Sequence, residues 1–294
     1  IGAEGEECSV QVIQDGNFSS LITNGYYYSD GTGDHADYAA SVTTDDKIPT
    51  ITINGGVFRG GINTVKNDNH SVATINGGEF VNTTQATVLN WNELTINGGT
   101  FNADSNALYA VITSYDGSTG YNNGITNIAG GKFTGAIIAD YGAANVHYAI
   151  SGGEFSTMPK AAYFEDGFVA SWNEERKAYV TVEGEFVASV GAYSYATLQE
   201  AINAAAEGAT VKLLADVKEN VDIGKALTLD LNGNDITSTG SRTYGVIIKA
   251  GDVTVTDGTA AGEPSAVIGV ADRNADRALA ITNGAKNVRI ENVK

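Results

Sequence analysis

The residue types that could hold a metal ion gather in one short segment. The stretch SDGTGDHAD, at 29–37, places Asp30, Asp34 and Asp37 among glycines. Carboxylate oxygens on a loop that can wrap around an ion are the ligands that Ca²⁺ prefers. The segment lacks the spacing and the terminal glutamate of an EF-hand loop. It is therefore a candidate calcium site, and an acidic loop without a bound ion is the alternative.

Two stretches rich in glycine, asparagine and aspartate carry tyrosines that could bind a ligand. A tyrosine on a polar loop offers a large, rigid contact surface at a small cost in entropy, which suits sugar rings and protein partners. The alternative is that these rings pack back onto the body of the protein. The candidate ligand-binding residues are Tyr26, Tyr28 and Tyr38 in the first stretch and Tyr115 and Tyr121 in the second.

The sequence contains no recognisable catalytic motif. Arg59 is the only arginine before residue 160, and no aspartate cluster surrounds it in the sequence. The histidines at positions 35, 70 and 147 are scattered and lack cysteine partners or ligand spacing, so they predict no zinc site. We therefore name no catalytic residue and expect a chain that is not an enzyme.

A sequence repeat predicts the strands and turns that must position these residues. TINGGVF, TINGGEF and TINGGTF begin at Thr52, Thr74 and Thr95, and weaker copies occur at 12–18, 127–133 and 149–155. Asn54 and Asn76 are 22 residues apart and Asn76 and Asn97 are 21 apart, whereas the intervals from Gln14 to Asn54 and from Asn97 to Ala129 are 40 and 32. A nearly constant period with occasional longer gaps indicates stacked structural units whose loops vary.

The residues within one period predict the kind of unit. Apolar residues alternate on both sides of the glycine pair, and no apolar run is long enough for a helix. A unit of this length with two or three short strands predicts a β-solenoid, with Asn-Gly-Gly as a corner because glycine reaches positive φ without a steric cost. Stacking would align two columns, an amide ladder of Asn54, Asn76 and Asn97 and a ring column of Phe18, Phe58, Phe80, Phe101, Phe133 and Phe155.

The repeat pattern stops after residue 155, and the segment between residues 160 and 195 has a different pattern. The segments 168–172 and 177–182 predict a β-hairpin, and a helix is expected at about 197–207. Thr197 and Glu200 form a capping box, and Gly208 suits the C-terminal end. We expect a first solenoid at 1–160, a hairpin linker at 161–192 and a second solenoid at 193–294, whose open end the helix covers.

Two of these segments resemble a known family. YATLQEAINAAAEGATVKLLADVKENVDIGKALTLDLNGNDIT, at 195–237, resembles the first helix and coils of pectate-lyase-like right-handed parallel β-helix domains from surface proteins of Gram-positive gut bacteria. FEDGFVASWNEERKAYVTV, at 164–182, is similar to other modules of such proteins. The resemblance implies an all-β, right-handed parallel β-helix without implying one activity. The strand-like end at 288–294 adds the expectation of a longer protein, truncated here at its C-terminus.

Composition narrows the classes of partner. The net charge of −18 argues against nucleic acid and anionic membrane surfaces, which require a cationic face. No apolar run reaches the length of a membrane span, and the lone Cys8 cannot form an internal disulfide.

These features together favour an extracellular, secreted or cell-surface binding module. We expect it to adhere to glycans or host surface proteins without catalysis, with calcium as a possible ligand. One alternative is a polysaccharide lyase or glycoside hydrolase that uses one face of the solenoid with Arg59 or a lysine. The other alternative is a passive structural stalk.

Overall fold

The computed structural model divides the chain into two compact units. Unit 1 comprises residues 1–168 and 172–182, and unit 2 comprises residues 169–171 and 183–294. The structure describes residues 11–14 (backbone only), 20–24, 50–67, 71–103, 109–114, 124–139, 147–240, 244–259, 265–271 and 277–294. Within these ranges the fold is all-β, and its helices are the short α2 (Leu198–Ala204) and the 3-10 turn η3 (Ala161–Tyr163).

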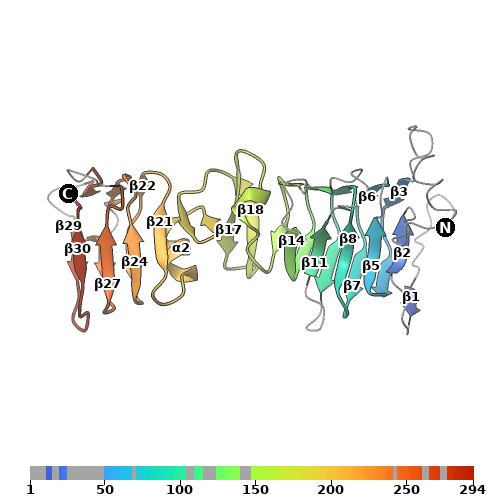
Figure 1. Cartoon of the computed structure of the whole chain (residues 1–294), viewed down its shortest axis with the longest axis horizontal. Helices are drawn as coiled ribbons and strands as arrows, with labels where there is room; N and C mark the ends of the chain where they lie inside the picture. The colour runs from blue at the N-terminus through green and yellow to red at the C-terminus, as the bar shows by residue number, and fades with distance from the viewer. Residues whose placement is uncertain are drawn as a thin grey trace, which may run out of the picture. The chain divides into compact units, whose positions relative to one another are not determined.

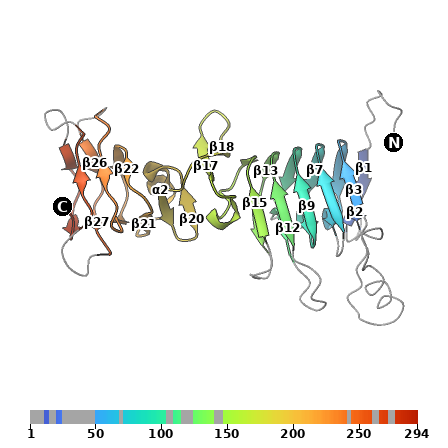
Figure 2. The same cartoon turned by 90° about the horizontal axis from the view of Figure 1, so that it is seen from above.

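Unit 1 contains three sheets, and the chain visits them in the order C, A, B in each repeat (Figures 1 and 2). Sheet C holds the strands before each glycine pair: β3 (Thr50–Ile53), β6 (Val72–Ile75), β9 (Glu93–Ile96), β12 (Ile125–Ile128) and β15 (His147–Ile150). Sheet A begins with β1 (Gln11–Gln14), which no glycine pair precedes among the described residues, and continues with the strands after each pair: β4 (Val57–Gly60), β7 (Glu79–Asn82), β10 (Thr100–Ala103), β13 (Lys132–Thr134) and β16 (Glu154–Phe155). Sheet B holds β2 (Ser20–Asn24), β5 (Asn63–Asn67), β8 (Ala86–Asn90), β11 (Tyr109–Thr113) and β14 (Ala136–Ala139).

Each strand pairs in parallel with its counterpart one repeat later. Thr74 is in register with both Thr52 and Thr95, and Phe80 is in register with both Phe58 and Phe101. The sequence period is therefore the structural period. The parallel sheets agree with the all-β expectation and are compatible with a solenoid.

The two glycines of each corner serve different purposes. The second glycine has positive φ, +119° at Gly78, as the prediction for this corner requires. The first glycine allows close approach of the preceding repeat, because a Cβ at Gly77 would lie 3.0 Å from the carbonyl oxygen of Asn54. The predicted amide ladder is present beside these glycines: Asn76 donates to Asn54 Oδ1 at 2.7 Å, and Asn97 donates to Asn76 Oδ1 at 2.8 Å.

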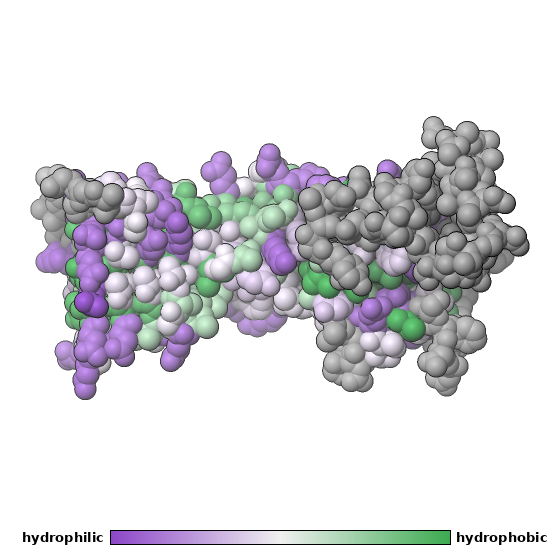
Figure 3. Space-filling model, viewed as in Figure 1, coloured by the Kyte–Doolittle hydropathy of each residue, from purple (hydrophilic) through white to green (hydrophobic). Residues whose placement is uncertain are grey.

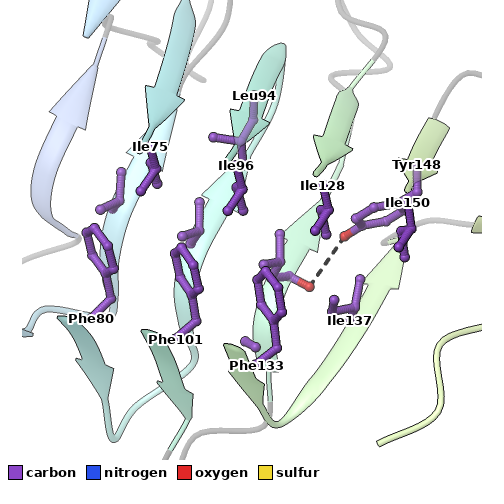
Figure 4. Packing of buried hydrophobic residues seen from close by; sticks show 14 of the residues in the cluster. Ile75, Phe80, Leu94, Ile96, Phe101, Ile128, Phe133, Ile137, Tyr148 and Ile150 are labelled. Carbon is purple, nitrogen blue, oxygen red and sulfur yellow. Dashed lines mark hydrogen bonds between the residues drawn. The ribbon is translucent and has the colours of Figure 1, made fainter. Parts of the chain in front are cut away.

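The predicted phenylalanine column forms the centre of the unit 1 core (Figure 4). Successive rings stack with centroids 4.8 to 5.1 Å apart and nearly parallel planes. The described rings are Phe58, Phe80, Phe101, Phe133 and Phe155, of which the last four are fully buried. The prediction that Phe18 extends this column is wrong, because β1 places Val12 in register with Phe58. The copy at 12–18 therefore does not align with the other copies in the stack. Ile75, Ile96, Ile128 and Ile150 of sheet C form a second buried column against the rings.

An antiparallel strand ends the parallel series of sheet A. β18 (Ala178–Glu183) follows β17 (Phe168–Asn173) and pairs with β16, so that Tyr179 lies opposite Phe155. Trp172 then packs edge-on against Tyr179, with ring centroids 5.2 Å apart. The predicted hairpin therefore supplies an aromatic end to the phenylalanine column.

Unit 2 repeats the parallel arrangement with different sheets. Sheet D contains β20 (Tyr193–Tyr195), β19 (Ala188–Val190), β21 (Thr210–Leu213), β24 (Leu227–Asp230), β27 (Val253–Thr256) and β30 (Arg289–Glu291). Sheet E contains β22 (Val217–Lys218), β25 (Ile236–Thr237) and β28 (Ile268–Gly269), and sheet F contains β23 (Val221–Ile223), β26 (Tyr244–Ile248) and β29 (Arg277–Ile281). The sequence did not predict the strands of sheet E, because two residues are too few to show an alternating pattern.

Helix α2 is tied to the first strands of unit 2. Its predicted N-cap is present, because the Glu200 amide donates to Thr197 Oγ1 at 3.2 Å. The side chain of Gln199 forms with β23 the two hydrogen bonds that a neighbouring strand would form. Its Oε1 accepts from the Asp222 amide, and its Nε2 donates to the Asp222 carbonyl. The helix therefore covers a free strand edge.

The helix is shorter than the predicted 197–207. It ends at Ala204 because Ala205 is already extended, with ψ of 135°. The Lys225 ammonium group donates to the carbonyl oxygens of Asn203 and Ala205, which replaces the partners that a further helical turn would supply. Gly208 has positive φ in the turn beyond the helix and is not its C-cap.

Truncation of one ring tests the phenylalanine column. We expect Phe101→Ala to lower the free energy of unfolding of unit 1 by about 3–5 kcal/mol, because it leaves a cavity between two stacked rings. Both tryptophans, Trp91 and Trp172, lie in unit 1, so tryptophan fluorescence during urea denaturation reports this unit alone. The exposed neighbour Thr100 is the control, since Thr100→Ala should change stability by less than about 0.5 kcal/mol. Equal losses in both variants would contradict a core centred on the rings.

Candidate functional site

The connections of unit 1 vary in length mainly at one corner, which lies between sheets B and C. The connections at this B–C corner are residues 25–49, 68–71, 91–92, 114–124 and 140–146. The connections between sheets C and A, in contrast, always consist of three residues that end in the glycine pair. Variable loops at one position of a regular scaffold are where binding residues are commonly found.

All the predicted ligand residues fall within two of these connections. Tyr26, Tyr28 and Tyr38 and the candidate calcium ligands Asp30, Asp34 and Asp37 belong to 25–49, and Tyr115 and Tyr121 belong to 114–124. These eight residues lie outside the described residues, so they remain predictions. The strands that flank them are described, and they bring both connections to the B–C corner.

A buried asparagine ladder, here called the inner ladder, holds this corner together. The Nδ2 of Asn24 donates to Oδ1 of Asn67, and the Nδ2 of Asn67 donates to Oδ1 of Asn90, both at 2.8 Å. Asn90 continues the ladder by donating to Thr126 Oγ1 at 2.9 Å, and the Thr126 hydroxyl lies 2.6 Å from that of Thr113. Each asparagine is the last residue of its strand in sheet B.

The inner ladder also joins sheet B to sheet C. Asn24 donates to the carbonyl of Val72 at 2.9 Å, Asn67 to that of Glu93 at 2.8 Å and Asn90 to that of Ile125 at 2.9 Å. Val72, Glu93 and Ile125 are the first residues of β6, β9 and β12. Each asparagine therefore binds the second sheet C strand that follows it in the chain, and not the strand that its own connection leads to. These bonds satisfy buried polar groups and join adjacent repeats at the B–C corner.

Sequence reasoning missed the inner ladder. A signal was present, because SLITN, NTVKN and ATVLN each end a short strand-like run with asparagine. Asparagine at such a position is equally typical of a solvent-exposed turn. Only the stacking shows that these side chains face inward.

The corner also carries a described aromatic residue. Trp91 follows β8, and the Lys66 ammonium group of β5 lies 4.7 Å from the centroid of its ring. Trp91 is the first residue of the shortest of the five connections, residues 91–92, so the pair places a cation and an aromatic ring at this connection.

Among the described residues, those weighed for catalysis or metal binding form no cluster, and His35 and His70 lie outside the described residues. Arg59, on sheet A, forms an ion pair with Glu79 of the adjacent strand. His147 is exposed on sheet C. Among the described residues, no group of three or more His, Cys, Asp or Glu side chains is placed to hold a metal ion. No helix in the described ranges has the length and apolar character needed to cross a membrane.

One buried hydroxyl group in unit 1 is an anchor of the core. Tyr148 of β15 points inward, and its hydroxyl donates to the carbonyl of Ile138 at 2.8 Å and approaches that of Val111 (Figure 4). Burial raises the pKa of this hydroxyl well above its usual range. The group therefore stays neutral and joins sheets B and C.

The most perturbed carboxylate lies in unit 2. Asp257 is buried, and it accepts hydrogen bonds from the Thr259 hydroxyl at 2.7 Å, the Ser265 hydroxyl at 2.9 Å and the amides of Gly233 and Ala266. The Thr259 hydrogen bond is the main reason that the pKa of Asp257 lies far below its usual range, and the Ala266 and Ser265 bonds act in the same direction. Because donors already surround both oxygens, the carboxylate organises the chain around β27 and is not available to a substrate.

Comparisons of the chain with protein-family models, curated proteins and solved structures found no match.

Unit 1 contains two asparagine ladders, the buried inner ladder and the exposed ladder of Asn54, Asn76 and Asn97, here called the outer ladder. The same substitution can therefore be made in a buried and in an exposed position. Asn67→Asp should lower the free energy of unfolding of unit 1 by about 3 kcal/mol or more, because a buried carboxylate would face the Asn90 amide oxygen and a backbone carbonyl without protons to donate. Asn76→Asp in the exposed outer ladder should cost less than about 1 kcal/mol. Urea denaturation followed by tryptophan fluorescence measures both values. Similar losses would contradict the structural importance of the inner ladder.

The lowered pKa of Asp257 predicts the acid response of unit 2. A carboxylate with a lowered folded-state pKa stabilises the fold above its unfolded value of about 3.9, and this stabilisation is lost as the pH falls below that value. We expect Asp257→Asn to lower the Tm of unit 2 at neutral pH and to flatten its decline between about pH 4 and 2.

Calorimetry of the full chain measures this effect in the transition that leaves tryptophan fluorescence unchanged. Asp252→Asn is the control, since Asp252 is exposed and accepts from Asn287 Nδ2. A decline as steep in Asp257→Asn as in the unmodified chain would show that Asp257 does not cause it.

Proposed function

We propose that the chain is an extracellular, secreted or cell-surface β-solenoid module that binds glycans or host surface proteins through the B–C corner of unit 1. Both units are right-handed parallel β-helices in this proposal. The observation that carries it is the concentration of variable connections at one corner of an otherwise regular stack. The tyrosines of two of these connections supply the contact surface, and the acidic segment at 29–37 offers a calcium-dependent contribution.

The strand order of sheet B sets the minimum length of a ligand that contacts both tyrosine-bearing connections. The connections 25–49 and 114–124 leave from β2 and β11, which are three strand spacings apart in sheet B. At about 4.8 Å per strand, their bases are separated by about 14 Å. A ligand that engages both is therefore an extended oligosaccharide or a peptide segment, and a monosaccharide would engage only one.

The inner ladder supports this proposal physically. A binding loop needs fixed ends if its side chains are to be presented without a large entropic cost. Asn24 and Asn90 are the residues that immediately precede, respectively, the 25–49 and 91–92 connections, and Thr113 precedes 114–124. Their buried hydrogen bonds hold the bases of these loops in place.

A glycan array and a substitution pair test the proposal. We expect the purified chain to bind a subset of mucin, plant or glycosaminoglycan structures, and Tyr115→Ala or Tyr121→Ala to weaken binding about tenfold or more. Tyr193→Ala is the matched control, because Tyr193 is a partly exposed tyrosine of unit 2 and should leave binding unchanged.

The same array read with and without calcium, and with analysis for cleavage products, separates the alternatives. Binding that depends on calcium would support an ion at Asp30, Asp34 and Asp37. Unsaturated or reducing-end products would establish a lyase or hydrolase in place of a binding module. Absence of both binding and cleavage, with no binding to host surface proteins, would leave the passive stalk.

A further inference from the structure

The outer ladder repeats a dipeptide that is chemically labile. Asn54, Asn76 and Asn97 are each followed by glycine, and so is Asn232 in unit 2. Asparagine is among the thermolabile residues, and a following glycine allows its own amide nitrogen to attack the asparagine side chain because no Cβ blocks the approach. The attack requires the asparagine side chain to move, so the hydrogen bonds that hold it affect the rate. Identical dipeptides in different surroundings therefore reveal the effect of structure alone.

Hydrogen bonds hold the members of the outer ladder unequally. Asn76 forms two side-chain bonds, because its Nδ2 donates to Asn54 Oδ1 at 2.7 Å and its Oδ1 accepts from Asn97 Nδ2 at 2.8 Å. Asn97 has the bond that it donates to Asn76, and within the described part of the chain nothing donates to its Oδ1. Both residues are exposed to solvent water. The side chain of Asn97 therefore moves at the cost of one hydrogen bond and that of Asn76 at the cost of two.

The ladder stops at Asn97 because alanine occupies the next place in the column. Ile128 is in register with Ile96, so Ala129 follows Asn97 by one repeat. The backbone is equivalent at the two positions. The Ala129 amide donates to the Ile96 carbonyl at 2.9 Å, and the Asn97 amide donates to the Ile75 carbonyl at 2.8 Å. The methyl group of Ala129 cannot donate a hydrogen bond, so Asn97 lacks the bond that Asn76 accepts.

The same dipeptide in unit 2 is held in both of its reacting parts. The Nδ2 of Asn232 donates to the Leu213 carbonyl at 2.9 Å, and the Gly233 amide donates to Asp257 Oδ1 at 2.9 Å. The Gly98 amide, in contrast, has no hydrogen-bond acceptor among the residues that the structure describes. Asn97 is therefore open to attack where Asn232 is protected.

We infer that Asn97 is a site of spontaneous deamidation and that its conversion makes Asn76 the next site. The Gly98 nitrogen forms a bond to Asn97 Cγ, the bond from Cγ to Nδ2 breaks, and ammonia leaves with the proton of the Gly98 amide. Water then opens the cyclic imide at either carbonyl group and gives aspartate or isoaspartate, without any oxidation or reduction. A carboxylate at position 97 cannot donate to Asn76 Oδ1, so Asn76 keeps only its bond to Asn54.

The modification falls on the corner that tolerates the least change. Isoaspartate adds one carbon atom to the backbone beside Gly98, where a Cβ would already lie 2.8 Å from the Asn76 carbonyl oxygen. Figures 1 and 3 view unit 1 from the side of sheet B, where hydrophobic residues reach the surface, whereas the outer ladder lies between sheets C and A. The reaction can therefore be followed without a change at the B–C corner and independently of the proposed function.

Tandem mass spectrometry of the full chain, aged in a mildly alkaline buffer, measures the conversion of each asparagine. A sample unfolded in urea gives the rate of each residue without structure, so the ratio of the folded to the unfolded rate is compared. We expect this ratio to be about two- to tenfold higher at Asn97 than at Asn76, because Asn76 must break one more hydrogen bond. The ratio should be lowest at Asn232.

Three variants test the direction of the effect. Ala129→Asn supplies a donor to Asn97 Oδ1 and should lower the ratio at Asn97 about two- to tenfold. Ala129→Leu is the matched control, because leucine has a similar branched shape but no hydrogen-bond donor, and it should leave that ratio unchanged. Asn97→Ala removes the donor to Asn76 and should raise the ratio at Asn76 by a similar factor.

A ratio at Asn76 equal to or above that at Asn97 would overturn this assignment, because the bond that Asn76 accepts would then activate its amide carbon and not restrain it. Equal slowing of Asn97 by Ala129→Asn and Ala129→Leu would also overturn it, since bulk and not hydrogen bonding would be responsible. An unchanged ratio at Asn76 in Asn97→Ala would contradict the predicted order of conversion.

Discussion

The structure depends on the stacking of parallel strands in register at a spacing of about 4.8 Å. At this distance each side chain lies against its counterpart in the next repeat, so a column must consist of groups that interact favourably with their own kind. Phenylalanine rings stack, isoleucines pack and asparagine amides donate to one another, and these are the groups that form the columns of unit 1. A column of identical charges would repel. Accordingly, the charged residues Arg59, Glu79 and Lys132 lie on the outward face of sheet A.

The same spacing explains why the corners of unit 1 behave differently. At the C–A corner the backbones approach too closely for a Cβ, as at Gly98, where it would lie 2.8 Å from the Asn76 carbonyl oxygen. Neither the length nor the residue type can change there without displacing the adjacent repeat. At the B–C corner the inner ladder satisfies the buried polar groups and joins the sheets by side chains. The connection itself is then free to vary, which is the physical basis of the proposal that this corner binds a ligand.

Unit 2 solves the same stacking problem with different polar anchors. Buried Asp257 gathers donors from the segments around β27, and the Asp235 carboxylate accepts from the Val267 amide while the Asp235 amide donates to Asp216. These carboxylates satisfy backbone groups by hydrogen bonds, as the inner ladder does in unit 1, but a carboxylate can only accept hydrogen bonds. They therefore bind amides and hydroxyl groups and do not form a ladder of like residues. Helix α2 covers the edge of β23 through the side chain of Gln199.

Much of the architecture could be read from the sequence because it is local and repeated. The period of 21 to 22 residues, the glycine corner, the phenylalanine column and the helix N-cap at Thr197 all depend on residues close in sequence or on one motif that recurs. The tyrosine and calcium sites were also drawn from local composition, and they remain predictions because they lie outside the described residues.

The tertiary structure decided the features that depend on the direction of side chains and on contacts between residues distant in sequence. Asn24 and Asn67 are buried partners 43 residues apart, although each resembles a turn residue in sequence, and both long gaps belong to the same corner. Composition alone could not show either fact, because inward and outward faces are assigned only when the repeats stack.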